Sequence, residues 1–167
     1  TAEASGSAVS VGGFIGSIGN VGDVTVTNCY ATGDVTGSAD YAGGFIGQNG
    51  SAGIVENCYS NGRATGSNNV GGFCGGIHDD GNITNCFWDY QTSGLETTAG
   101  AAASKTTAEM QATTTFTAWD FETVWTAMKA DTGYKSFPYL QSNPPETKPG
   151  KTERDFAGGD GSAENPY

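Results

Sequence analysis

Positive charge is scarce in this sequence. Seven Lys and Arg residues stand against 18 Asp and Glu residues, with a single histidine, and the formal net charge is −11. Binding to a phosphate backbone draws its affinity from clustered cations, so we set nucleic acid aside as a partner. No apolar run approaches the roughly 20 residues that a membrane-spanning helix needs. The chain also begins without a methionine or a signal-peptide pattern, so we expect an internal part of a longer or processed protein.

Apolar side chains are the second shortage. They make up 36% of the 167 residues, whereas glycine alone contributes 27 residues. A chain of this length can form one domain with a real core, or a modest domain with an extension. The composition does not favour a thick globular core, so we expect a thin, turn-rich β architecture.

What the sequence does contain is a repeat. The segments "VGGFIG", "YAGGFIG" and "VGGFCGG", from residues 11, 41 and 70, each precede a strand-like stretch that ends in Asn, Cys and an aromatic residue. Cys29, Cys58 and Cys86 lie 29 and then 28 residues apart, and a fixed period in this range is typical of repeat architectures. Short strands between glycine turns predict an all-β fold, a parallel β-solenoid of about three coils. The alternative is an antiparallel β-sandwich.

Stacked coils would place each residue beside its counterpart in the next coil, about 4.8 Å away. Burial of like against like stabilises a repeat array, so we interpret these ladders as core. A sugar-binding strip is the alternative interpretation of the aromatic residues. The predicted ladders are Phe14, Phe45 and Phe73; Tyr30, Tyr59 and Phe87; Val26, Val55 and Ile83; Asn28, Asn57 and Asn85; and Cys29, Cys58 and Cys86.

The asparagine of each signature conflicts with strict strand alternation. Alternation would place Glu56 on the same face as Cys58, and a glutamate does not suit a core. The conflict disappears if each Asn turns a corner in the left-handed conformation, which asparagine tolerates better than most residues. Val26 and Cys29 can then both face inward, and we expect the three Asn amides to stack from coil to coil. Extended dihedrals at these positions would contradict the hypothesis.

The four cysteines invite a disulfide interpretation in a chain of secreted character. Stacked neighbours, however, hold their Cβ atoms near the strand spacing, beyond the roughly 3.5 to 4.5 Å of a disulfide. Cys74 occupies the position of Ile15 and Ile46, so it resembles a small hydrophobic residue. We expect four buried thiols, and a bridge between Cys74 and a ladder cysteine is the alternative. The spacing and the single histidine do not suit zinc.

One acidic turn is a candidate metal site. His78, Asp79 and Asp80 lie in "GGIHDDGN", and the terminal segment "GGDGSAEN" adds further carboxylates. Carboxylates and main-chain carbonyls suit calcium, but neither segment has a full ligand pattern. We therefore expect a solvated loop and no cofactor, with calcium as the alternative.

The character of the sequence changes after the third unit. We assign residues 1–94 to the β repeats and residues 95–140 to a C-terminal cap. In the cap, Thr106 and Glu109 form a capping-box pattern for a short helix that begins near residue 107. We expect the aromatic residues of the cap to plug the open end of the solenoid. Residues 141–155 have the proline and charge content of a linker, and residues 156–167 begin a new module or contact a neighbouring subunit.

The repeat segments and their order resemble the GLUG motif family. The resemblance rests on "VGGFIG" with "NCYATG", "GGFIG" with "NCYSNG" and "GGFCG" with "NCFWD", and it extends through "WDFETVW" and "FPYL" over residues 11–140. Phenylalanine and cysteine stand where this family commonly has leucine and serine. The resemblance implies a β-solenoid-like fold in surface or extracellular proteins, including adhesin-like chains and the non-catalytic flanks of secreted peptidases that cleave immunoglobulin A1. It supplies no catalytic residues.

We find no catalytic pattern in the sequence, because the one histidine lies in an acidic turn and no nucleophile has a partnered base. We expect a non-catalytic structural or adhesive module at the cell surface or in the extracellular space. Its partners would be copies of itself or adjoining modules, reached through a self-assembly tail that includes Phe156 and Tyr167. A carbohydrate-binding accessory domain is the alternative, with glycans as partners. Asn49 and Asn82 begin sequons that would serve as glycan sites.

Overall fold

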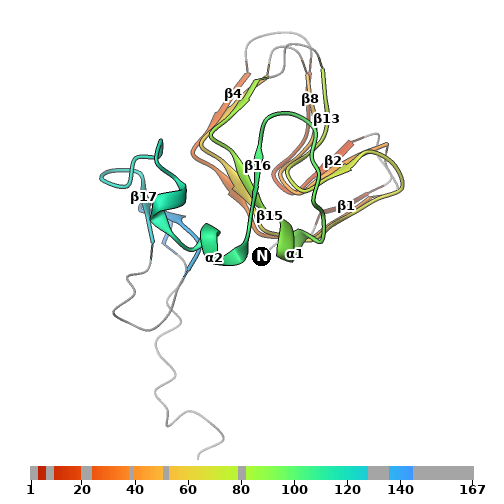
Figure 1. The fold of residues 1–167 in the computed structure, drawn as a ribbon. Coiled ribbons are helices and arrows are strands. Elements are labelled where there is room, and N and C mark those ends of the chain that lie inside the picture. The colour runs from red at the N-terminus through yellow and green to blue at the C-terminus, as the bar shows by residue number, and fades with distance from the viewer. Residues whose placement is uncertain are drawn as a thin grey trace, which may run out of the picture.

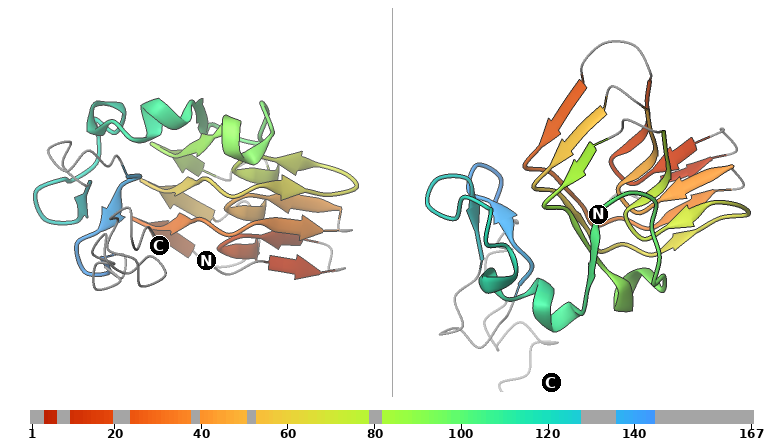
Figure 2. Two further views of the ribbon diagram at one scale, coloured as in Figure 1. Left: turned by 90° about the horizontal axis from the view of Figure 1, so that it is seen from below. Right: turned by 45° about the horizontal axis from the view of Figure 1, so that its top comes forward.

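A computed structural model describes residues 4–6, 10–19, 24–37, 40–50, 53–78, 82–127 and 136–144. The chain winds through successive coils that stack as layers, so that equivalent strands lie side by side (Figures 1 and 2). Pairing between coils is parallel and in register, with Val26 beside Val55 and Val55 beside Ile83. The structure confirms the parallel β-solenoid, and the pairing excludes an antiparallel sandwich for these coils.

Each side of the coil forms its own sheet. Sheet A contains β1 (Ala4–Gly6), β6 (Val35–Gly37) and β11 (Ala64–Thr65); sheet B contains β2 (Ser10–Gly12), β7 (Tyr41–Gly43) and β12 (Val70–Gly71); sheet C contains β3 (Ile15–Ile18), β8 (Ile46–Asn49) and β13 (Cys74–Ile77); sheet D contains β4 (Val24–Thr27), β9 (Gly53–Glu56) and β14 (Asn82–Thr84); and sheet E contains β5 (Tyr30–Ala31), β10 (Tyr59–Ser60), β15 (Phe87–Asp89) and β16 (Ala103–Lys105). Outside the coils lie α1 (Tyr90–Ser93), α2 (Thr107–Met110), the 3₁₀ turn η1 (Thr113–Thr115) and an antiparallel pair, β17 (Trp125–Thr126) with β18 (Tyr139–Leu140).

Asparagine and glycine residues form the corners of each coil. Asn28, Asn57 and Asn85 have φ values of 54°, 52° and 50°, as the corner hypothesis requires, so the alternation of side chains resets at each of them. Cys58 is consequently buried even though Glu56 remains partly exposed. At the Gly-Gly corner, a Cβ on Gly43 would lie only 2.0 Å from the main-chain oxygen of Ile46. That close approach of two backbone segments requires glycine.

The phenylalanine ladder runs through the interior of the coils. The ring centroids of Phe14 and Phe45 are 5.0 Å apart with planes at 10°, and those of Phe45 and Phe73 are 4.8 Å apart at 6°. These separations match the spacing of neighbouring strands. Phe45 and Phe73 are fully buried, whereas Phe14, on the first described coil, is 47% exposed. The ladder therefore belongs to the core at Phe45 and Phe73 and is exposed to solvent at Phe14.

Residues 95–105 cover much of the last coil. The amide of Gly72 donates to Thr97 O and that of Ala99 donates to Cys74 O, both at 2.9 Å. Further along, β16 pairs with β15 and extends sheet E by one strand. This segment satisfies main-chain groups that the final coil would otherwise expose.

The aromatic residues of the cap lie along the side of the coils, over sheet E, rather than over the open end (Figure 1). The Asn corner explains this difference from our expectation. Because the cysteine after each Asn faces inward, the aromatic residue that follows it faces outward and needs a cover. Met110, Phe116, Trp119 and Trp125 supply that cover.

The short helix of the cap begins where the sequence predicts. Thr106 Oγ1 accepts the amide proton of Glu109 at 3.1 Å, and the Thr106 amide donates to Glu109 Oε2 at 2.8 Å. These two bonds confirm the capping box in front of α2. Most of the predicted linker, and the predicted tail with Phe156 and Tyr167, lie outside the described residues.

Candidate functional site

The tyrosine ladder and the cap form an aromatic seam, which we define as Tyr30, Tyr59 and Phe87 with Trp119 and Trp125. The rings of Tyr30 and Tyr59 stack with centroids 5.3 Å apart and planes at 7°. The Tyr59 hydroxyl donates to Pro138 O at 2.7 Å, and burial raises the pKa of this phenol. Tyr59 and both tryptophans are buried, so the seam is a packing surface between coils and cap.

All three tryptophans of the chain are buried, and each indole N–H has a protein partner. Trp88 donates to Leu95 O at 2.9 Å, Trp119 donates to Asn85 O at 2.9 Å, and Trp125 donates to Asn28 Oδ1 at 3.1 Å. A sugar-binding strip needs aromatic faces that a ligand can reach. The tryptophans do not offer such faces in this structure.

The cysteines are free thiols, and Cys58, Cys74 and Cys86 are buried while Cys29 is half-buried. Each ladder thiol donates to the carbonyl oxygen two residues before it, over 3.1 to 3.2 Å. The hydrogen bond with Cys58, followed by burial, raises the pKa of Cys29. Burial raises the pKa of Cys74 to about 11. Thiols with raised pKa values are poor nucleophiles at neutral pH, which fits a packing role.

The Asn ladder does not form a continuous chain of amide hydrogen bonds. Asn28 Oδ1 accepts from Trp125, whereas Asn57 Oδ1 is buried without a hydrogen-bond partner. The corner conformation is therefore the common feature of Asn28, Asn57 and Asn85, and stacking of their amides stays a prediction.

The acidic turn after β13 is only partly described. Gln48 Nε2 lies 3.1 Å from His78 Nε2 and donates to this ring nitrogen. Asp79 and Asp80, the proposed calcium ligands, lie outside the described residues. Among the residues that are described, no group of three or more His, Cys, Asp or Glu side chains is positioned to hold a metal ion.

Asp89 is the one fully buried carboxylate of the described segments, and it has a structural role. Its Oδ1 accepts the amide protons of Gln91 and Thr92, which caps α1, and its Oδ2 accepts from the Thr107 hydroxyl at 2.6 Å. These bonds hold α1 and α2 together. A carboxylate with this set of partners is already satisfied, which fits its structural role.

The two predicted glycan sites differ in access. Asn49 is fully buried, and its Nδ2 donates to Gly53 O at 3.2 Å. Asn82, at the start of β14, is exposed. A glycan attached to the nitrogen of Asn49 would have to replace a buried hydrogen bond, so only Asn82 is accessible in the folded chain.

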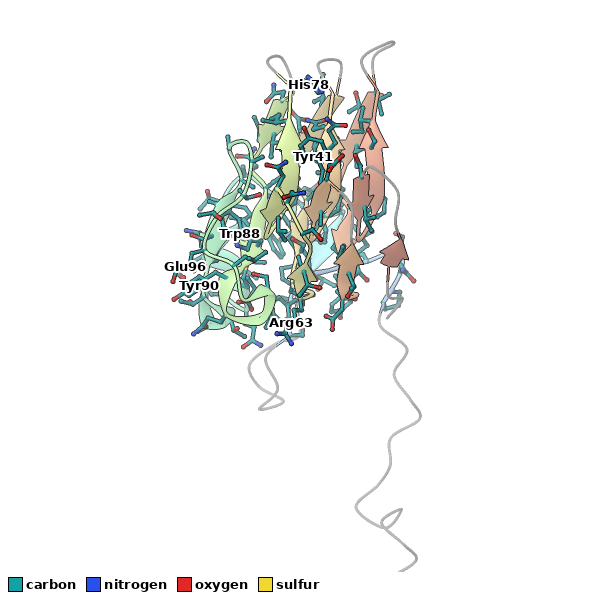
Figure 3. All side chains as sticks on the ribbon, turned by 90° about the vertical axis from the view of Figure 1, so that its right-hand side faces the viewer. Tyr41, Arg63, His78, Trp88, Tyr90 and Glu96 are labelled. Atoms are coloured by element: carbon teal, nitrogen blue, oxygen red, sulfur yellow. The ribbon has the colours of Figure 1, made fainter. Side chains whose placement is uncertain are left out.

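Two pockets that we did not predict lie near α1, each of about 290 Å³. One is lined by residues 63–66 of the β11 region, Val70 and residues 93–95, and the other by Tyr90, Glu96 and Ser104. In Figure 3, Arg63 lies at the lower edge of the coils, as do Tyr90 and Glu96, whereas His78 lies at the upper edge. Both pockets are lined by residues of the coils together with residues of the cap. These residues are not related by the repeat period, so the sequence spacing does not predict either pocket.

Comparison with known proteins agrees with the repeat geometry. The GLUG motif matches residues 38–65, which span β7 to β11 and include the second Asn-Cys-aromatic signature. The chain carries a GLUG motif. A provisionally named Gly-rich membrane protein from Evansella cellulosilytica is 38% identical over 81 residues, which cover 44% of this chain and 9% of that protein.

The GLUG coils also have a counterpart among solved structures. A crystal structure assigned to an immunoglobulin A1 protease from Bacteroides ovatus superposes with a TM-score of 0.61 at 23% identity, over 86% of this chain and 56% of that one. At this identity the likeness shows the fold. The chain spans about half the length of that protein and about a tenth of the curated relative. Within the part that the structure describes, no helix is both long and apolar enough to cross a membrane.

Proposed function

We propose that this chain is a non-catalytic structural or adhesive module of an extracellular or cell-surface repeat protein. The proposal rests mainly on the packing roles of the aromatic, cysteine and tryptophan side chains. The aromatic and cysteine ladders pack coil against coil, and the tryptophans join the coils to the cap. The buried carboxylate and the thiols are occupied by structural hydrogen bonds. The stacked coils form a regular scaffold and the whole chain carries a net charge of −11, which suits a spacer or a display element.

The comparisons support this proposal through the contexts in which similar chains occur. One relative is named as a membrane protein and the structural counterpart as a protease that acts on immunoglobulin A1. In both, the matching region is a part of a longer protein. Our proposal is that this chain is likewise a module of a longer protein, at the cell surface or in a secreted enzyme.

We further propose that the module self-assembles through residues 156–167. Electron microscopy of the full chain over a concentration series tests both the structural role and the self-assembly. We expect rods or filaments whose length grows with concentration, and shorter particles when the chain ends at residue 155. Compact monomers at every concentration would reject self-assembly and leave only the spacer role.

Carbohydrate binding is the second candidate function, and the pocket beside α1 favours it. Tyr90 supplies an aromatic ring, while Glu96 and Ser104 supply hydrogen-bonding groups around a space of about 290 Å³. An aromatic face with a few convergent polar groups is a common arrangement for a small polar ligand. A glycan array tests it: binding that Tyr90→Ala abolishes and Tyr41→Ala leaves unchanged would support this function. An array without binding would reject it.

A further inference from the structure

Sheet A ends at β11, whose outer edge has no neighbouring strand in the described chain. A further layer covers other parts of the last coil. In sheet E it is β16, and above sheets B and C the segment around Thr97 and Ala99 bonds to Gly72 and Cys74. Above β11 the corresponding position is a pocket of about 290 Å³. No further strand of the described residues is present at this position, as is also the case beside β14, the last strand of sheet D.

The main chain of β11 is ready to pair on that open side. Val35 N donates to Arg63 O at 2.7 Å, and Ala64 lies in register with Val35. In a parallel pair, successive residues of a strand turn their main-chain groups to opposite sides. The N–H and C=O of Ala64 therefore point away from β6, and no described main-chain group of α1 or the following loop bonds to them.

The pocket beside this edge has an apolar floor and a charged rim. Val35 and Ala64 are buried, with Val70 and Leu95 packed against them. Arg63 and Thr65 flank Ala64 on the exposed face. Arg63 forms no ion pair within the described residues, and its side chain projects at the lower end of the coils (Figure 3). An added strand would need a small residue at the floor and an acidic residue at the rim.

The sequence contains a segment with these properties. The strands of sheet A are followed by closely similar residues, which read "SGSA" from Ser5, "TGSAD" from Thr36 and "TGSN" from Thr65. A further copy, "DGSAE", begins at Asp160 and shares with "TGSAD" the acidic residue at its end. "GSA" also occurs at residues 50–52 between β8 and β9, but glycine follows it there.

Aligning Asp160 of "DGSAE" with Thr65 of "TGSN" sets the register of the added strand against β11. Gly159 falls beside Ala64, in the pocket that Leu95 helps to line. Asp160 falls beside Thr65, whose hydroxyl already bonds to Thr36 Oγ1 at 3.3 Å in the preceding layer. From there the carboxylate lies diagonal to Arg63, within reach of a long side chain.

We propose that β11 is the acceptor for residues 159–163 of a second copy of this chain, which join sheet A as a parallel fourth strand. This inference rests on the self-assembly in the proposed function and names its contact surface. We take the donor from another copy because the proposed function has the tail contact a neighbouring molecule. The intervening sequence contains Pro144, Pro145 and Pro149, and such linkers favour an extended course over a return to the same molecule.

The experiment uses an ¹⁵N-labelled acceptor chain that ends at residue 158, which retains every described residue, and unlabelled full-length chain as the donor. On titration we expect saturable amide shifts at residues 63–66 and 94–95. Arg63→Glu in the acceptor should weaken binding by about tenfold, because it places like charges together, while Arg63→Lys should stay within about threefold of the unmodified acceptor. Asp160→Lys in the donor should weaken binding equally, and pairing it with the Arg63→Glu acceptor should restore most of the affinity.

Several results would overturn the inference. One is the absence of amide shifts at β11 when the donor is at millimolar concentration. Another is a binding affinity that stays the same when Arg63→Glu and Asp160→Lys are introduced singly or together. A third is a labelled full-length chain whose β11 signals are already in the bound position at any dilution, which would mean docking within one molecule. Filaments that persist with Arg63→Glu would retain self-assembly and reject β11 as its contact, whereas a full-length chain that never associates would reject both.

Discussion

Trp125 donates its indole N–H to the side-chain oxygen of Asn28 across 3.1 Å, although 97 residues separate them. Asn28 turns the corner of the first described coil, and Trp125 is fully buried in β17 of the cap. The cap also bonds to the last corner, where Trp119 donates to Asn85 O. Repeat arrays normally depend on contacts between adjacent units. Here one segment ties the first coil to the third.

We predict that Trp125→Phe lowers the free energy of unfolding by about 1–3 kcal/mol, because it leaves Asn28 Oδ1 without its donor. Urea unfolding of this variant, of Asn28→Gly and of the double variant forms a cycle in which glycine keeps the corner conformation. We expect a coupling of about 0.5–3 kcal/mol between the two changes. Simple additivity of the two effects would mean that the hydrogen bond contributes nothing.

The left-handed corner makes a second prediction. At Asn57, glycine should be tolerated and alanine should cost roughly 1–2 kcal/mol more than glycine, because a Cβ disfavours positive φ. Asn61 in the next turn is the control, since its φ is not positive; there alanine should be the better of the two. Urea midpoints for the four variants measure both differences. If alanine and glycine rank in the same order of stability at both sites, the left-handed corner is not the cause of the difference at Asn57.

The third prediction concerns alkaline pH. Burial raises the pKa of Cys74 from about 9 to about 11, so the unfolded chain loses this proton at lower pH than the folded chain. The stabilisation is complete below pH 9 and is lost as pH rises towards 11, by about 2–3 kcal/mol in total. Urea midpoints at pH 8 and pH 10.5 should fall less for Cys74→Ala than for the unmodified chain. Equal losses in both chains would show that Cys74 is not responsible.

The coils could be predicted from the sequence because their determinants are local and occur three times. The Asn-Cys-aromatic signature fixes a corner and two facing directions within three residues. The conflict between Glu56 and Cys58 is visible in the order of the residues alone, and a left-handed Asn57 resolves it. The capping box of Thr106 and Glu109 is equally local, since both partners lie within one helical turn.

The cap and the open edge of β11 could not be predicted in this way. The Trp125–Asn28 contact joins residues with no shared period, so the sequence does not indicate which cap residue lies against which coil. The pocket at β11 brings Arg63 to Leu95 only after the coils have stacked. A sequon is defined by three residues and does not indicate burial. Asn49 and Asn82 both begin sequons, yet Asn49 is buried and Asn82 is exposed in the folded chain.

The fourth prediction compares two equivalent phenylalanines. Phe45 lies between two rings and is fully buried, so Phe45→Ala should cost about 3–5 kcal/mol, the usual range for a buried aromatic. Phe14 has one stacked neighbour and is 47% exposed, so Phe14→Ala should cost less than about 2 kcal/mol. Unfolding by urea under one set of conditions gives both values. Equal costs at the two positions would mean that burial within the stack does not determine the contribution of each ring.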